Sequence, residues 1–111
     1  MQRQESRRVP RHSIAVDVEV TDVHSQIQIR ERTRDLSLFG CGLEAAQLLP
    51  TGTKVKIKLS HAGEDVAATG RVVYSGPDLG MGIVFTDVEP DAERTLDDWI
   101  AVLTRLSLRG L

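Results

Sequence analysis

The sequence predicts a mainly β domain: a six-stranded antiparallel β-barrel that ends in a C-terminal amphipathic α-helix. Two observations support this prediction. Apolar and polar residues alternate along several short segments separated by turn residues, which is typical of antiparallel strands joined by hairpins. Near the C-terminus the apolar spacing changes from two residues to about 3.6, which is typical of a helix. Closing the sheet into a barrel removes its exposed strand edges.

The predicted strands are short and follow one another at hairpin spacing. The first alternates most strictly, since Ile14, Val16, Val18 and Val20 share one face. Polar or glycine-containing turns separate the strands. The strands are expected at 14–20, 26–34, 41–45, 54–59, 66–74 and 81–85.

Two of these segments lead to specific expectations. Val72 and Tyr74 stand two residues apart in the long strand at 66–74, so both are expected on its inner face. The segment 35–42 breaks the alternation and contains two glycines. We interpret it as a turn that leads into the third strand.

The helix is expected at about 89–107. Pro90 suits the first helical turn, and acidic residues precede and follow it at the positive end of the helix dipole. We expect the helix to cover an open end of the barrel, although its apolar stripe also suits a partner protein or a second copy. The residues of this stripe are Ala92, Leu96, Trp99, Ile100, Leu103 and Leu106.

Length and composition fit one domain. The chain has 111 residues, of which 41% are apolar and 27% charged. We expect a flexible, arginine-rich segment at 1–12 and a barrel domain with its helix at 13–111. The sequence contains no apolar run long enough to span a membrane and no secretory signal. The single cysteine, Cys41, excludes an internal disulfide, so we expect a cytoplasmic protein.

The charge pattern disfavours a general nucleic-acid binder. The formal net charge is −2, whereas such proteins are usually basic overall. Positive charge gathers at 1–12 and negative charge at 87–98, so any anion site is expected to be small and local. Single-strand binding also needs aromatic stacking platforms. The chain offers only Phe39, Tyr74, Phe85 and Trp99.

Nothing in the sequence supports catalysis, a metal site or a cofactor. His12, His24 and His61 lie far apart and lack metal-ligand spacing. Cys41 stands between two glycines and suits a buried apolar position. The acidic residues at 87–98 are best explained by helix capping and a solvated face, and a carboxylate metal site is the remote alternative. We therefore expect a binding protein rather than an enzyme.

Two motifs remain as candidates for binding. Arg7, Arg8 and Arg11 concentrate in five residues around an extended proline segment, where arginine forks suit phosphate oxygens and guanine edges. Asp35 and Ser37 stand two residues apart and precede Gly40. Each motif also has a simpler explanation: a solvated basic tail for the first, an Asx or Ser turn for the second.

Together the motifs resemble those of the PilZ domain family, whose members are receptors for the bacterial second messenger cyclic di-GMP. Arg7 and Arg11 match the family's R-x-x-x-R motif. Asp35, Ser37 and Gly40 match its D/N-x-S-x-x-G motif, and the late segment Gly80–Phe85 is also similar. The resemblance covers nearly the whole chain and implies binding of cyclic di-GMP without turnover.

The resemblance also implies a role for each motif residue. Arg7 and Arg11 contact phosphates and the O6/N7 edge of guanine, and Arg8 adds a third contact. Asp35 accepts from guanine N1–H and N2–H₂, Ser37 adds a hydroxyl contact, and Gly40 lets the ligand approach. The flexible segment becomes ordered around the ligand and passes the signal to a downstream protein partner.

Two other functions compete with this one. A PilZ-like barrel without nucleotide affinity acts purely through protein contacts, and a small barrel binds single-stranded nucleic acid. The oligomeric state and the downstream process stay open at this point.

Overall fold

The computed structural model describes residues 11–109, and side chains up to Leu106. It contains six strands and one helix. Their bounds are β1 (Asp17–Asp22), β2 (Gln28–Ser37), β3 (Gly40–Leu43), β4 (Lys54–His61), β5 (Glu64–Gly76), β6 (Gly80–Val88) and α1 (Pro90–Arg109).

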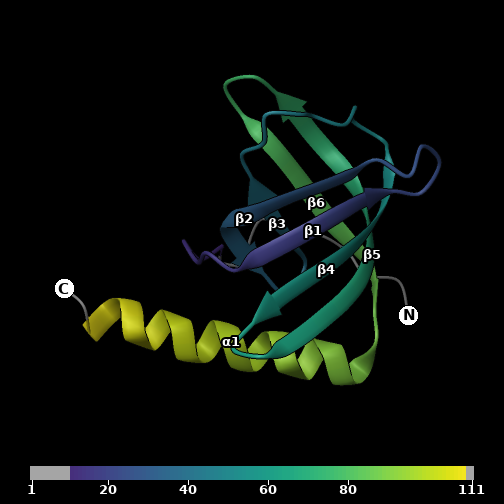
Figure 1. The fold of residues 1–111 in the computed structure, drawn as a ribbon. Helices are drawn as coiled ribbons and strands as arrows, with labels where there is room; N and C mark the ends of the chain where they lie inside the picture. Colours follow the sequence, from purple (N-terminus) through teal and green to yellow (C-terminus); the bar gives the residue numbers. More distant parts are fainter. Residues whose placement is uncertain (1–10, 110–111) are drawn as a thin grey trace.

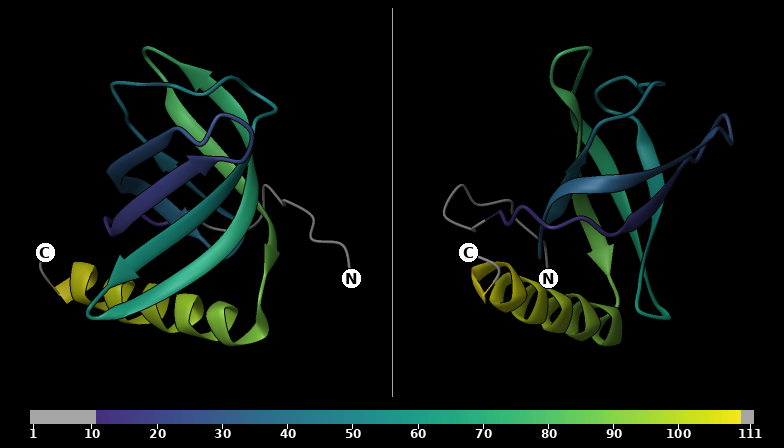
Figure 2. Two further views of the ribbon diagram at one scale, coloured as in Figure 1. Left: turned by 45° about the vertical axis from the view of Figure 1, so that its right-hand side comes forward. Right: turned by 60° about the vertical axis from the view of Figure 1, so that its left-hand side comes forward.

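The predicted fold is confirmed. All strand pairs are antiparallel, and the strands close into a barrel in the order β1-β2-β3-β6-β5-β4. The helix α1 lies across one end of this barrel (Figures 1 and 2). Leu96 and Trp99 of α1 belong to the same buried cluster as the strand residues, so α1 closes the core at that end.

The chain entering the barrel forms no regular strand pair, and the Thr33 side chain and several backbone hydrogen bonds hold it, among them the one from Thr33 N to Val16 O (2.9 Å). β1 begins at Asp17, so the expected strand start at residue 14 is wrong. Thr33 Oγ1 accepts a hydrogen bond from Val16 N (3.0 Å) and donates one to Ile14 O (2.7 Å). Ile14 and Val16 are nevertheless buried, because the alternation that predicted a strand also describes an extended entry segment.

The interpretation of 35–42 as a turn is also wrong. β2 runs on to Ser37 and β3 begins at Gly40, so the turn contains only Leu38 and Phe39. The alternation breaks because β2 contains a bulge: Thr33 pairs with Leu43 and Asp35 with the neighbouring Gly42, which leaves Arg34 as an extra residue.

A second bulge explains why Tyr74 is not on the inner face. Val72 pairs with Ile83 and Tyr74 with Gly82, so Val73 is the extra residue of β5. Val72 is fully buried in the core, whereas Tyr74 is half-buried and lies outside the barrel against Gly82. The expectation that both residues share the inner face is therefore wrong.

The helix begins and ends close to its expected bounds. Leu96 and Trp99 are buried, and Ala92, Ile100 and Leu103 pack partly against the core. Leu106 is 56% exposed, contrary to expectation, because α1 continues past the edge of the barrel (Figure 1). Within residues 11–109, no helix combines the length and apolar character needed to cross a membrane.

Gly40 allows β3 to approach β6. A Cβ added at Gly40 would overlap the carbonyl oxygen of Ile83, which belongs to the β6 backbone and cannot move aside. We therefore expect Gly40→Ala to lower the free energy of unfolding by about 1–3 kcal/mol, as overpacking does elsewhere. Urea denaturation measures the change.

Gly76→Ala is the matched control for this substitution. A Cβ at Gly76 meets its nearest atom, Leu79 Cδ1, at an ordinary 3.5 Å. The free energy of unfolding of the Gly76→Ala variant is expected to differ from that of the wild type by no more than about 0.5 kcal/mol. Equal stability of the two variants would contradict the packing role of Gly40.

Cys41 is a core residue with an unreactive thiol. It is fully buried, and burial raises the pKa of its thiol to about 12, with a smaller contribution from the charge of Asp35. At pH 8 only ~10⁻⁴ of such thiols are ionised, and the thiolate is the reactive form. The native protein is therefore expected to resist Ellman's reagent at pH 8, whereas the urea-unfolded chain reacts with one equivalent. Rapid reaction of the folded protein would show that Cys41 is accessible.

Candidate functional site

The site is built on a row of residues that crosses four strands. Asp35 of β2 pairs with Gly42 of β3, Gly42 pairs with Gly82 of β6, and Gly82 pairs with Tyr74 of β5. The two central positions have no side chains. The outer residues of the row therefore have room to lie across the sheet surface.

Side chains fill the space above these glycines. A Cβ on Gly82 would overlap the ring of Tyr74, so the ring lies directly on this residue. A Cβ on Gly42 would come within 2.6 Å of Asp35 Oδ2 and 2.8 Å of Arg34 Nη2. The glycines thus form a floor for Tyr74, Arg34 and Asp35.

Arg34 is held at three points above this floor. Its Nε donates to Asp35 Oδ2 (3.3 Å), its Nη1 to Leu79 O (2.9 Å) and its Nη2 to the Tyr74 hydroxyl (2.7 Å). Desolvation lowers the pKa of Arg34, but the hydrogen bond to Asp35 and the nearby Tyr74 outweigh it and raise the pKa overall. The guanidinium is therefore a fixed, permanently charged group.

Arg11 approaches Asp35 from the other motif. Its Nη1 lies 3.5 Å from Asp35 Oδ1. The approach depends on the adjacent residue, because His12 and Leu36 exchange backbone hydrogen bonds of 3.0 and 2.9 Å. Asp35 Oδ1 is buried and accepts no hydrogen bond from the described residues. Among the described residues, this oxygen therefore has an ion-pair partner, Arg11, but no hydrogen-bond donor.

Ser37 and Gly40 shape the turn beside this pair. The Ser37 hydroxyl accepts a hydrogen bond from Phe39 N (3.1 Å) and donates one to Gly40 O (3.4 Å), and both residues are buried. The Ser turn that the sequence allowed as a simpler explanation is therefore present.

The structure brings together part of the predicted set. Arg11 and Asp35 meet, and Ser37 and Gly40 form the adjacent turn. Arg7 and Arg8 lie outside the described residues, as does most of the expected flexible segment 1–12.

The sequence places Arg30, Arg32 and Arg34 on the outer face of the second strand and leaves two alternatives open: they extend the positive site, or they are simply exposed. Of the three, Arg34 lies beside Asp35. The sequence analysis did not identify Tyr74 as a member of the site.

The feature that points to Arg34 is a shift, along β2, from burial at odd positions to burial at even positions. Thr33 is buried at an odd position and Leu36 at an even one, so an extra residue has to stand between them.

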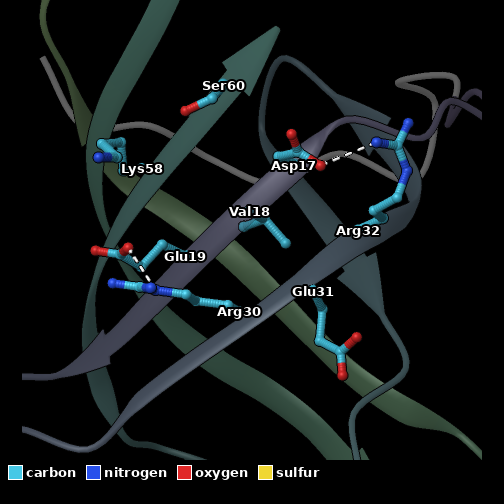
Figure 3. A pocket seen from close by; sticks show the side chains of 8 residues that line it. All are labelled: Asp17, Val18, Glu19, Arg30, Glu31, Arg32, Lys58 and Ser60. Carbon is cyan, nitrogen blue, oxygen red and sulfur yellow. Dashed lines mark hydrogen bonds and ion pairs between the residues drawn. The ribbon is translucent and has the colours of Figure 1, made fainter.

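A hollow of about 580 Å³, apart from the residues of the candidate site, lies over β1, β2 and β4 and contains paired charges (Figure 3). Arg30 Nε lies 3.1 Å from Glu19 Oε2, and Arg32 Nη1 lies 2.9 Å from Asp17 Oδ1. Both arginines lie on the same strand as Arg34 and are neutralised by carboxylates of β1. This hollow therefore does not extend a positive site.

Metal binding has no support from the part of the chain that the structure describes. No three His, Cys, Asp or Glu side chains gather there closely enough to hold a metal ion. His61 lies at the end of β4 and packs edge-on against Trp99, with ring centroids 5.6 Å apart. The described histidines are therefore not arranged as metal ligands.

Comparison with solved structures shows where the barrel fold recurs. The chain is similar to the PilZ domain of YcgR from Escherichia coli, solved with c-di-GMP, with a TM-score of 0.74 and 20% identity over 96% of this chain and 97% of that one. It is also similar to the PilZ domain of CeSA from a cellulose-synthesizing bacterium, with a TM-score of 0.64 and 22% identity over 88% of this chain and 98% of that one.

A third similar structure is the Bacillus subtilis inhibitor of motility, MotI/DgrA, with a TM-score of 0.66 and 14% identity. The match covers 96% of this chain and 53% of that one. At these identities the three likenesses establish a shared fold. No curated protein matches the chain.

Family membership rests on the sequence itself. The family model described as the PilZ domain matches residues 1–102, which include both motifs and all six strands. The chain belongs to the PilZ domain family.

Proposed function

We propose that this domain is a cytoplasmic bacterial receptor for cyclic di-GMP that binds its ligand without turning it over. The meeting of Arg11 and Asp35 carries the proposal, because these residues come from motifs that are separated by the β1–β2 hairpin. The YcgR PilZ domain, solved with c-di-GMP, has the same fold. Family membership further supports this function.

The two charged groups match the two ends of a guanine base. A carboxylate accepts from N1–H and N2–H₂, the donor edge that distinguishes guanine from adenine. An arginine fork donates to O6 and N7, or to a phosphate of the ligand. In this proposal Asp35 takes the first role and Arg11 the second. Arg7 and Arg8 add contacts to phosphate, while Ser37 and Gly40 maintain the turn beside Asp35.

Ligand binding also orders the N-terminal segment in this proposal. Fixing each residue of a flexible segment costs about 1–2 kcal/mol, and each hydrogen bond to a charged group returns about 1.5–3 kcal/mol. The charge-assisted hydrogen bonds of the three arginines at 7–11 have to offset that ordering cost. The ordered segment then presents a new surface to a downstream protein.

The proposal predicts a loss of affinity when either charged group is removed. Arg11→Ala and Asp35→Ala are each expected to weaken cyclic di-GMP binding at least tenfold, about 1.4 kcal/mol. Isothermal titration calorimetry measures the affinity, with GTP and cyclic AMP as ligands that should not bind. A stoichiometry near two ligands per chain would indicate a stacked ligand dimer.

Arg30→Ala is the matched control, since Arg30 also pairs with a carboxylate but lines the hollow over β1, β2 and β4. It should bind like the wild type. Absence of binding by folded wild-type protein would contradict the proposal and favour a barrel that acts only through protein contacts. The exposed Val102 and Leu106 of α1 are then the first surface to test.

A further inference from the structure

We infer that Arg34 and Tyr74, which belong to neither motif, are positioning residues that fix the plane of the Asp35 carboxylate and thereby set the preference for guanine. This inference rests on the proposed function, because it concerns how that site recognises its base. It is carried by the bulge in β2, the glycine floor and the hydrogen bonds of Arg34.

The bulge places Arg34 and Asp35 on the same side of the sheet. Successive residues of a regular strand point to opposite faces, so adjacent side chains do not meet. Here Arg34 is the extra residue between Thr33 and Asp35, and its Nε lies 3.3 Å from Asp35 Oδ2. The irregularity therefore creates the contact.

The far end of Arg34 is anchored on two other strands. Nη1 donates to Leu79 O just before β6, and Nη2 donates to the Tyr74 hydroxyl of β5. Tyr74 is itself held against Gly82, which leaves its ring no room to move toward the sheet. The guanidinium thus connects β5 to Asp35 of β2, and hydrogen bonds fix its position at both ends.

This arginine fixes one oxygen of Asp35, and the other faces Arg11. Oδ2 accepts from Arg34, whereas Oδ1 lies 3.5 Å from Arg11 Nη1 and accepts no hydrogen bond from the described residues. A guanine donor at Oδ1 therefore has to displace only this ion-pair contact. A carboxylate has about four acceptor positions, so Oδ2 keeps capacity for a second donor. N1–H and N2–H₂ of guanine are parallel donors in the plane of the base. Both can donate to the carboxylate at once only when the carboxylate lies in the same plane as the base.

Direct ligand contact by Arg34 is the competing explanation. Arg34 is 39% exposed and charged, so it is accessible to a phosphate. Three of its five N–H groups already have partners. A phosphate contact would contribute equally whichever base the ligand carries. A positioning role instead affects only ligands that use both donors of the guanine edge.

The test compares cyclic di-GMP with cyclic di-IMP, whose hypoxanthine bases lack the exocyclic amine. Calorimetry gives both affinities for each variant, and their ratio measures recognition of N2–H₂. We expect the wild type to prefer cyclic di-GMP by about tenfold or more, the range of one good bidentate base contact. Asp35→Ala should bring the ratio close to one.

Two substitutions of Arg34 separate charge from geometry. Arg34→Met removes the charge, and Arg34→Lys keeps the charge but loses the fork that reaches three partners at once. Both are expected to lower the ratio to about threefold or less. Tyr74→Phe keeps the ring on Gly82 and removes only the hydroxyl, so it should lower the ratio by a smaller factor without disturbing the fold. Arg30→Met should keep the wild-type ratio.

The outcomes separate this inference from the proposed function. If the wild type binds neither nucleotide, the proposed function fails and the inference fails with it. If the wild type binds but Arg34→Met and Tyr74→Phe keep the wild-type ratio, only the inference is wrong. Equal losses for both nucleotides in Arg34→Met would identify Arg34 as a phosphate contact and would also overturn it.

Discussion

Closure of the barrel depends on β3, the shortest strand, which has to pair with β2 on one side and β6 on the other. All four of its residues are buried. Cys41 and Leu43 belong to the core, so Gly40 and Gly42 face outward. The space at Gly40 admits backbone atoms of β6, and the space at Gly42 admits Asp35 and Arg34. The same strand thus closes the fold and supports the candidate site.

The three arginines of β2 show what this support does. Arg30, Arg32 and Arg34 alternate along one strand, yet their side chains are 75%, 62% and 39% exposed. The first two lie over ordinary strand surface and pair with carboxylates of β1. Only Arg34 has glycines beneath it. In Arg34 the bulge and the glycines beneath the side chain together distinguish it from Arg30 and Arg32, which have the same side chain on the same strand.

The sequence predicted the regular parts of the molecule well. Strict alternation located β4 and the inner residues of β6, and the change to helical spacing located α1. Through the family resemblance, the two motifs assigned Arg11 and Asp35 to one ligand site, and the structure adds that the two side chains lie close together. These features follow from periodicity and from residue identity, both of which can be read along the chain.

The errors occur where the strands are irregular. The bulges at Arg34 and Val73 reverse the alternation within β2 and β5, and each turns a side chain onto the glycine row. A bulge is a mismatch in pairing between two strands. The sequence of one strand therefore shows only that its apolar–polar alternation breaks, and not which residue is the extra one. The role of Arg34 depends on Tyr74, which lies 40 positions further along the chain. Contacts of this range become visible only when the barrel is closed.

The bridge between His12 and Leu36 has a mechanical consequence. Two backbone hydrogen bonds clamp residue 12 to the strand position next to Asp35. Arg11 precedes this bridge by one residue. A change in the direction of the chain at residue 11 therefore acts on the backbone next to Asp35. A displacement of the chain at residue 12 is likewise transmitted directly to the strand position beside Asp35 of the candidate site.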